Sequence, residues 1–461
     1  MKRVAVLAVG AAIALLPPPW DIAPNAWALL AIFIATILAV LLDAFPLLPS
    51  ALVALAIAVL SGTLTPAQAY SGFSKGFILL ILVAFIIAKA MLRSGLGARI
   101  ATWLIARFGT STLRLGYCIA ATDMLIAPAF PSNTARSGVL FPIAHALAID
   151  TGSRAHDGTR NRTGRFLMFV SFASLKISSA FWLTAMAANP AGVAIARDLG
   201  IEIGFGTWLL AACVPGAVAI IVLPLFLMRV CPPELQHTPD APRIARDRLR
   251  DMGPVTRDEK VMATVFFALM VGWALSGLFG WDPAAIAFAG LGVLLISGVY
   301  PLGAIKSECG DALETFLWFA ILYTLSTYLN EFGFMGILGE KLASPLEGVA
   351  WPVVYVTLTA LYILIHYFFV SQTAHLLALY GVFLEISLRS GIPPYLAAFT
   401  YLFATNYFAA ITPQASSANV IFVGSGYITP GEVYRYGGLM TLVSFVVYMV
   451  IGTPWILLVL P

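Results

Sequence analysis

The sequence contains few charged residues for its length. Of 461 residues only 10% are charged, whereas 60% are hydrophobic. Soluble domains carry about 25% charged residues, so this composition excludes a water-soluble globular protein. The long apolar runs show no alternation of period two, which excludes a transmembrane β-barrel. The composition therefore predicts an all-α polytopic membrane protein.

Metal-binding patterns are also missing. The five histidines include no His-Glu-x-x-His pattern, so a zinc hydrolase of that type is excluded. The four cysteines have no metal-type spacing and lie in or beside apolar runs, as small buried hydrophobic residues do. They are Cys118, Cys213, Cys231 and Cys309. We expect no metal, no cofactor, no enzymatic activity and no nucleic-acid partner.

The start of the chain resembles a secretory signal but is interpreted as the first span. Met1-Lys2-Arg3 precede an apolar run to Leu16, which ends at Pro17-Pro18-Pro19-Trp20 without a convincing small-x-small cleavage site. Another apolar stretch follows almost at once. Because no Ser/Arg-rich transit peptide precedes it, we expect a multi-pass protein of a bacterial inner membrane.

Arginine clusters predict which segments face the cytoplasm. The segment 93–114 and the stretch 150–165 are rich in arginine, and 229–260 is the most hydrophilic part of the chain. The positive-inside rule places all three in the cytoplasm, the last as a linker between two halves. Spans need roughly 20 apolar residues each, so the runs leave room for about eleven spans plus shorter interrupted pieces.

Two of the interrupted pieces predict re-entrant hairpins. The stretch 115–149 is broken by Pro131-Ser132-Asn133-Thr134, and the stretch 350–389 by Ser371-Gln372-Thr373. Broken backbone at membrane depth is tolerated where it lines a polar cavity. The number of membrane crossings before each hairpin places the open end of the first on the cytoplasmic side and that of the second on the outer side. We therefore expect an inverted-topology repeat of residues 1–228 and 261–461.

Two further spans are broken beyond the hairpins. The first is interrupted at Asn189-Pro190 and the second at Ser416-Ser417. These positions correspond in the two halves. We expect four broken elements to meet near the midplane and to line one substrate site.

The chemistry of the hairpin tips favours an anion. Each second arm begins a helix whose first N–H groups lack partners and whose dipole is positive at that end. Ser132 and Ser371 are good N-cap residues. Two facing helix N-termini would hold an anion charged at both ends. Side-chain hydrogen bonds are expected from Asn133, Thr134, Gln372 and Thr373.

A basic residue follows each triplet by one helical turn. Arg136 and His375 would add positive charge to the site and offset the dehydration of carboxylates. The alternatives are a salt bridge of Arg136 to Asp123 and ordinary packing for His375. Lys176 lies deep in its span, and the interpretation we favour pairs it with Asp123.

These motifs resemble the divalent anion/sodium symporter family over nearly the whole chain. Ser132-Asn133-Thr134 matches the first Ser-Asn-Thr signature, and Ser371-Gln372-Thr373 matches the second with Gln in place of Asn. Arg136 and the Thr373-Ala374-His375 sequence are more similar to the exchanger branch, which includes citrate/succinate, tartrate/succinate and 2-oxoglutarate/malate translocators. In that branch fixed cations are thought to replace sodium.

The resemblance implies an elevator-type homodimer without bound sodium. A scaffold domain would consist of residues 1–114 and 261–349, and a transport domain of residues 115–205 and 350–427. We expect an antiporter of di- or tricarboxylates, with a sodium-coupled symporter as the alternative. An anion channel is the third possibility, and the symmetric hairpins argue against it.

Overall fold

The computed structural model describes residues 2–460, and every regular element in that range is a helix. Seven helical stretches there are long and apolar enough to cross a membrane, which confirms a polytopic membrane protein. They are Pro24–Leu41, Gly76–Ser94, Phe205–Val230, Arg257–Phe279, Gly310–Glu331, Trp351–Phe368 and Pro430–Val459. Other apolar helices are shorter or interrupted, so the expected count of about eleven spans stays a prediction.

The first half of the chain contains eleven α-helices and three short 3-10 turns. In chain order they are α1 (Lys2–Leu15), α2 (Pro24–Leu41), α3 (Leu47–Leu60), α4 (Pro66–Ala69), η1 (Ser71–Ser74), α5 (Gly76–Ser94), α6 (Leu96–Phe108), α7 (Thr112–Ile126), η2 (Ala127–Ala129), α8 (Asn133–Asp150), α9 (Gly164–Phe181), η3 (Leu183–Ala185), α10 (Ala188–Asp198) and α11 (Phe205–Val230).

The second half follows the linker helix α12 (Ala241–Asp251). Its elements are α13 (Arg257–Phe279), α14 (Pro283–Ile296), α15 (Leu302–Glu308), α16 (Gly310–Glu331), α17 (Phe334–Ala343), η4 (Ser344–Leu346), α18 (Trp351–Ile365), η5 (His366–Phe368), α19 (Gln372–His375), η6 (Leu376–Tyr380), α20 (Gly381–Arg389), α21 (Pro394–Tyr407), η7 (Phe408–Ala410), α22 (Ser417–Gly424), α23 (Pro430–Glu432), η8 (Val433–Gly437), α24 (Gly438–Val447), η9 (Tyr448–Gly452) and α25 (Thr453–Val459).

The hairpin tips have the same backbone conformation in both halves. Ser132 has φ −146° and ψ 124°, and Ser371 has φ −145° and ψ 125°. Each serine hydroxyl accepts a hydrogen bond from the backbone N–H three residues on, at 3.3 Å, as an N-cap residue does. A 3-10 turn, η2 or η5, precedes each tip. The sequence triplets therefore mark equivalent helix starts.

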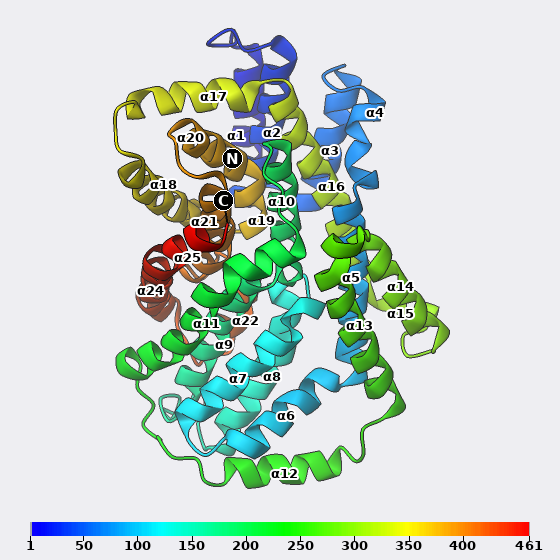
Figure 1. Cartoon of the computed structure of the whole chain (residues 1–461), viewed down its shortest axis with the longest axis vertical. Coiled ribbons are helices and arrows are strands. Elements are labelled where there is room, and N and C mark those ends of the chain that lie inside the picture. Colours follow the sequence, from blue (N-terminus) through cyan, green and yellow to red (C-terminus); the bar gives the residue numbers. More distant parts are fainter. Residues whose placement is uncertain (1, 461) are drawn as a thin grey trace.

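A short helix connects each hairpin to the preceding long helix. Gly95 joins α5 to α6 with φ +78°, and Gly333 joins α16 to α17 with φ +80°. Glycine adopts this left-handed conformation without steric cost, so both chain reversals depend on it. Figure 1 shows α17 at the top of the molecule, with α6 and α12 at the bottom.

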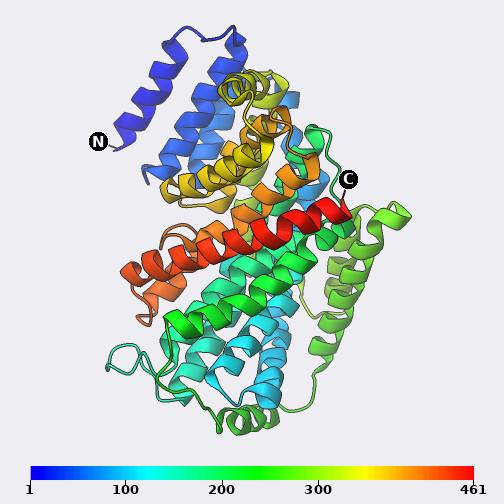
Figure 2. The ribbon, with the colours of Figure 1, turned by 60° about the vertical axis from the view of Figure 1, so that its left-hand side comes forward.

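The linker between the halves is more ordered than the solvated loop expected from its charge. Its helix α12 packs against α6 and runs along the lower end of the molecule (Figure 2). Arg248 pairs with Asp150 at 2.7 Å, and Arg99 pairs with Glu259 at 2.6 Å. Ion pairs and an apolar contact therefore hold the linker to the first half.

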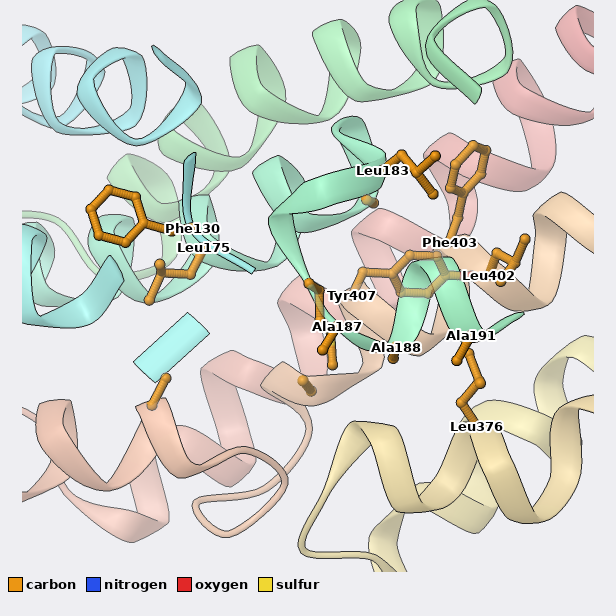
Figure 3. Packing of buried hydrophobic residues seen from close by; sticks show 14 of the residues in the cluster. Phe130, Leu175, Leu183, Ala187, Ala188, Ala191, Leu376, Leu402, Phe403 and Tyr407 are labelled. Carbon is orange, nitrogen blue, oxygen red and sulfur yellow. The ribbon is translucent and has the colours of Figure 1, made fainter. Parts of the chain in front are cut away.

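The most buried helices are the two broken spans, α9 and α21. Every residue is buried from Phe166 to Ser179 of α9 and from Leu396 to Tyr407 of α21. All of them except Lys176 are apolar or small and polar. Figure 3 shows Ala187, Ala188 and Ala191 beside Tyr407 and Leu402 of α21 and Leu376 of the second hairpin. The breaks of one half thus pack directly on helices of the other.

We predict that Gly95→Ala and Gly333→Ala each lower the free energy of unfolding by about 1 kcal/mol, because alanine is strained at positive φ. Denaturant unfolding in detergent measures this change. The control is Gly292→Ala. Gly292 lies within α14 with nothing within 4 Å of an added Cβ, so this change should be neutral or slightly stabilising. Equal effects at all three sites would contradict the assigned backbone role.

Candidate functional site

The two hairpin tips are joined by one side-chain hydrogen bond. Asn133 Nδ2 donates to Gln372 Oε1 at 3.0 Å, although these residues are 239 positions apart. Both side chains are buried, and Gln372 Nε2 also donates to the backbone oxygen of Thr405 at 2.9 Å. The starts of α8 and α19 are consequently held next to each other, as the repeated triplets predicted.

Hydroxyl groups form the accessible part of this arrangement. Thr134 Oγ1 and Ser417 Oγ lie 2.6 Å apart, and both residues are exposed. Ser132 and Ser371 are half-buried, whereas Thr373 and Ser416 are buried. The first hairpin and the second break therefore present polar groups to the same accessible space.

Each broken span is closed by an asparagine that binds free carbonyl groups. Asn189 Nδ2 donates to the backbone oxygens of Ser179 and Trp182 at 2.8 and 3.2 Å. Asn419 Nδ2 donates to those of Ala409 and Thr412, at 2.8 and 2.9 Å and at the same sequence spacings of ten and seven. Pro190 is buried in the first turn of α10, where a missing N–H is tolerated.

The oxygens of these two asparagines accept hydrogen bonds from the opposite half. Asn406 Nδ2 donates to Asn189 Oδ1 at 2.9 Å, and Lys176 Nζ donates to Asn419 Oδ1 at 2.8 Å. Lys176 and Asn406 each lie thirteen residues before the asparagine of their own half. The contacts are thus reciprocal, but one donor is a neutral amide and the other a lysine.

Arg136 adopts the salt bridge that the sequence left open as an alternative. Its Nη1 lies 3.3 Å from Asp123 Oδ1 and 2.5 Å from Ser178 Oγ. Its Nη2 donates to Asn133 Oδ1 at 2.5 Å and also contacts Ser179. The side chain is fully buried, so in this conformation it supports Asn133 and has no exposed surface for direct contact with substrate.

The expected pairing of Lys176 with Asp123 is wrong for this structure. Arg136 takes one carboxylate oxygen of Asp123, and the Ser178 hydroxyl donates to the other at 2.5 Å. Lys176 instead reaches Asn419 and lies 5.1 Å from the ring centre of Phe172. Each carboxylate oxygen therefore has a partner without the lysine.

His375 belongs to an aromatic cluster that includes a second histidine. His375 Nδ1 lies 3.2 Å from His366 Nδ1, and His366 Nε2 donates to the backbone oxygen of Ala415 at 3.1 Å. The ring centres of Tyr362, Phe408 and Phe369 are 4.5, 4.7 and 4.8 Å from that of His375. His375 Nε2 has no hydrogen-bond partner among the described residues. Sequence reasoning gave His366 no role.

Other members of the site were also missed from the sequence. Asn406, Ser178 and Ser179 contact predicted site residues, yet none stands out from its local sequence. Asn419 could have been found, because it occupies the second break as Asn189 occupies the first.

Enzyme-like groups are not assembled in the described part of the chain. Residues 2–460 contain no cluster of three or more His, Cys, Asp or Glu side chains that could hold a metal. One Gly-x-Ser-x-Gly sequence occurs at 72–76, but the exposed Ser74 hydroxyl donates to the backbone oxygen of Ser71 at 3.0 Å. That serine lies in a 3-10 turn and not in a strand-turn-helix elbow.

Comparison with known proteins identifies a transporter family. Residues 1–460 match the family described as the sodium:sulfate symporter transmembrane region. YflS of Bacillus subtilis, provisionally named as a malate transporter, is 40% identical over 97% of this chain and 94% of its own length. Dicarboxylate transporter 1 of spinach chloroplasts is 37% identical over 98% of this chain and 80% of its own.

A solved structure shares the fold at low sequence identity. The Alcanivorax borkumensis YdaH transporter superposes with a TM-score of 0.63 and 17% identity, covering 88% of this chain and 90% of that one.

We predict that Arg136→Gln lowers the free energy of unfolding by about 3–5 kcal/mol, because it leaves the buried Asp123 carboxylate without a cation. Adding Asp123→Asn should restore most of this loss. Thermal and denaturant unfolding in detergent measure both variants. Arg93→Gln breaks an exposed pair with Glu308 and serves as a control costing less than about 1 kcal/mol. A stable Arg136→Gln single variant would contradict the prediction.

Proposed function

Because the chain belongs to the sodium:sulfate symporter transmembrane family and is a membrane transporter and not an enzyme, we propose that it exchanges di- or tricarboxylate anions across the membrane. The relatives named for malate and dicarboxylates support this substrate class. The alternative within transport is a sodium-coupled symporter.

The hydrogen bond between Asn133 and Gln372 is the observation that carries the proposal. It brings together two helix N-termini, each with unpaired N–H groups and a positive dipole end. The substrate-binding set that we propose combines both tips and both breaks. Its residues are Ser132, Asn133, Thr134, Arg136, Ser371, Gln372, Thr373, His375, Asn189, Pro190, Ser416 and Ser417. Arg136 would act through Asn133, which it touches.

The hydrogen bonds that the buried amide oxygens accept favour exchange over sodium symport. Asn133 Oδ1 accepts from Arg136 and Ser179, and Gln372 Oε1 accepts from Asn133. Asn189 and Asn419 oxygens accept from Asn406 and Lys176. An amide oxygen that already accepts a hydrogen bond has fewer lone pairs left for a hard cation, and Asn133 Oδ1, with two donors, has none. The protein's own donors thus compete with a sodium ion for these amide oxygens, which supports the proposal of an exchanger.

The transport movement is proposed to be of the elevator type. The hairpins and broken spans, residues 115–205 and 350–427, contact each other through buried polar bonds between the halves. They would move as one domain against a scaffold of residues 1–114 and 261–349. The glycine-linked helices α6 and α17, which contact α7 and α20, would then lie where the two domains join. A homodimer in a bacterial inner membrane completes the proposal.

We predict that reconstituted protein takes up labelled malate only when the vesicles contain a counter-anion such as succinate, and that replacing sodium with potassium leaves the rate unchanged. The physical reason is that fixed protein donors replace the coupling ion. Empty vesicles are the control for uniport. Uptake that requires sodium, or proceeds equally into empty vesicles, would refute the exchanger.

We also predict that Gln372→Ala lowers the rate of malate exchange at least about tenfold, since it breaks the bridge between the tips and leaves Asn133 Nδ2 without its acceptor. Gln414→Ala is the matched control, because Gln414 is exposed and makes only a long contact with Tyr434. Transport assays with equal amounts of folded protein compare the two. Equal exchange rates would remove Gln372 from the site.

A further inference from the structure

Lys176 is a deeply buried basic residue without an acidic partner. It lies in α9 with 2% of its surface exposed, and no carboxylate of residues 2–460 approaches within 4.0 Å of its ammonium group. Arg136 and Asp123 form a charged pair with each other, and the second carboxylate oxygen of Asp123 accepts from Ser178. An unpaired charge in an apolar bundle is costly and marks a functional position more often than a structural one.

The hydrogen bond to Asn419 does not explain why this residue is a lysine. At the equivalent place in the second half Asn406 makes the same kind of contact to Asn189, at 2.9 Å against 2.8 Å for Lys176. A neutral amide is therefore sufficient to hold the oxygen of the break. The positive charge must have another use.

The partner of Lys176 lies close in sequence to the exposed hydroxyl of Ser417. Asn419 lies in the first turn of α22, two residues after Ser417, which is exposed and touches Thr134. An ammonium group has three N–H donors, and only one has a partner among the described residues. The ring of Phe172, 5.1 Å away, stabilises the charge without using a donor.

We propose that Lys176 supplies the counter-charge for one carboxylate of the transported anion, on the α22 side of the site. This inference rests on the proposed function and adds a binding residue to it. In the empty carrier Lys176 holds Asn419. In the loaded carrier its free N–H groups turn to the substrate carboxylate, so that the buried charge is compensated only when an anion is bound.

The same assignment gives a reason for exchange. An empty transport domain would have to carry a protonated Lys176 through the apolar membrane interior without a bound anion, which is unfavourable. Binding of an anion lowers that barrier. Loss of the charge should accordingly loosen the requirement for a counter-substrate.

The test compares Lys176→Gln, which keeps a hydrogen-bond donor, with Lys176→Met, which keeps neither donor nor charge, and Lys176→Arg, which keeps both. We expect Gln and Met variants to lose malate affinity at least tenfold and to show a raised ratio of uniport to exchange. The Arg variant should stay within a few-fold of the parent. Lys89→Asn, in the half-exposed pair of α5 with Asp311, is the control and should leave transport unchanged.

Thermal unfolding separates this role from a structural one. Removing an uncompensated buried charge should keep or raise the unfolding temperature of Lys176→Gln, while the upward shift that malate gives the parent protein disappears. A Gln variant with the parent's malate affinity and strict exchange would overturn the assignment. If the parent itself shows neither a malate-induced shift nor malate exchange, the proposed function fails first.

Discussion

Two helices that stop inside a membrane impose the constraint on which this structure depends. The unwound backbone of each break leaves carbonyl groups without partners at a depth where water is absent. Asn189 and Asn419 meet this need in the same way, each binding two carbonyl oxygens of its own break. Because each asparagine then has one oxygen left, the breaks require donors from elsewhere, and those donors come from the opposite half.

This exchange of donors determines the electrostatics of the site. Asn133 is fixed by Arg136 and Ser179, and the charge of Arg136 is offset by Asp123. The pair is neutral and rigid, which suits a support for the first tip better than a mobile substrate ligand. Lys176 has no carboxylate within 4.0 Å among the described residues, and under the proposal above it is the cation that the substrate compensates. The buried network still leaves polar atoms without a partner among the described residues, including His375 Nε2 and Arg136 Nε.

The sequence was informative where a polar residue interrupts an apolar run. Ser132, Ser371, Asn189 and Ser416 were selected as candidates because the cost of a polar residue in a membrane is visible in the local sequence. Partners could not be found this way. Lys176 meets Asn419 across 243 residues, and only the packing of the two halves decides this. His366 does not stand out in the sequence, yet the arm finishes in a 3-10 turn that places it against His375.

Equivalent positions of the two halves carry chemically different side chains. Arg136 corresponds to His375, Asp123 to Tyr362, and Lys176 to Asn406, although Ser132 and Ser371 share one backbone conformation. The first tip rests on an ion pair and the second on edge-to-face and tilted ring contacts. A dianion held between them would meet a different environment at each end. Under the proposed function a substrate with unlike ends, such as malate, would therefore have one preferred orientation, because only the side near Lys176 offers a free charge.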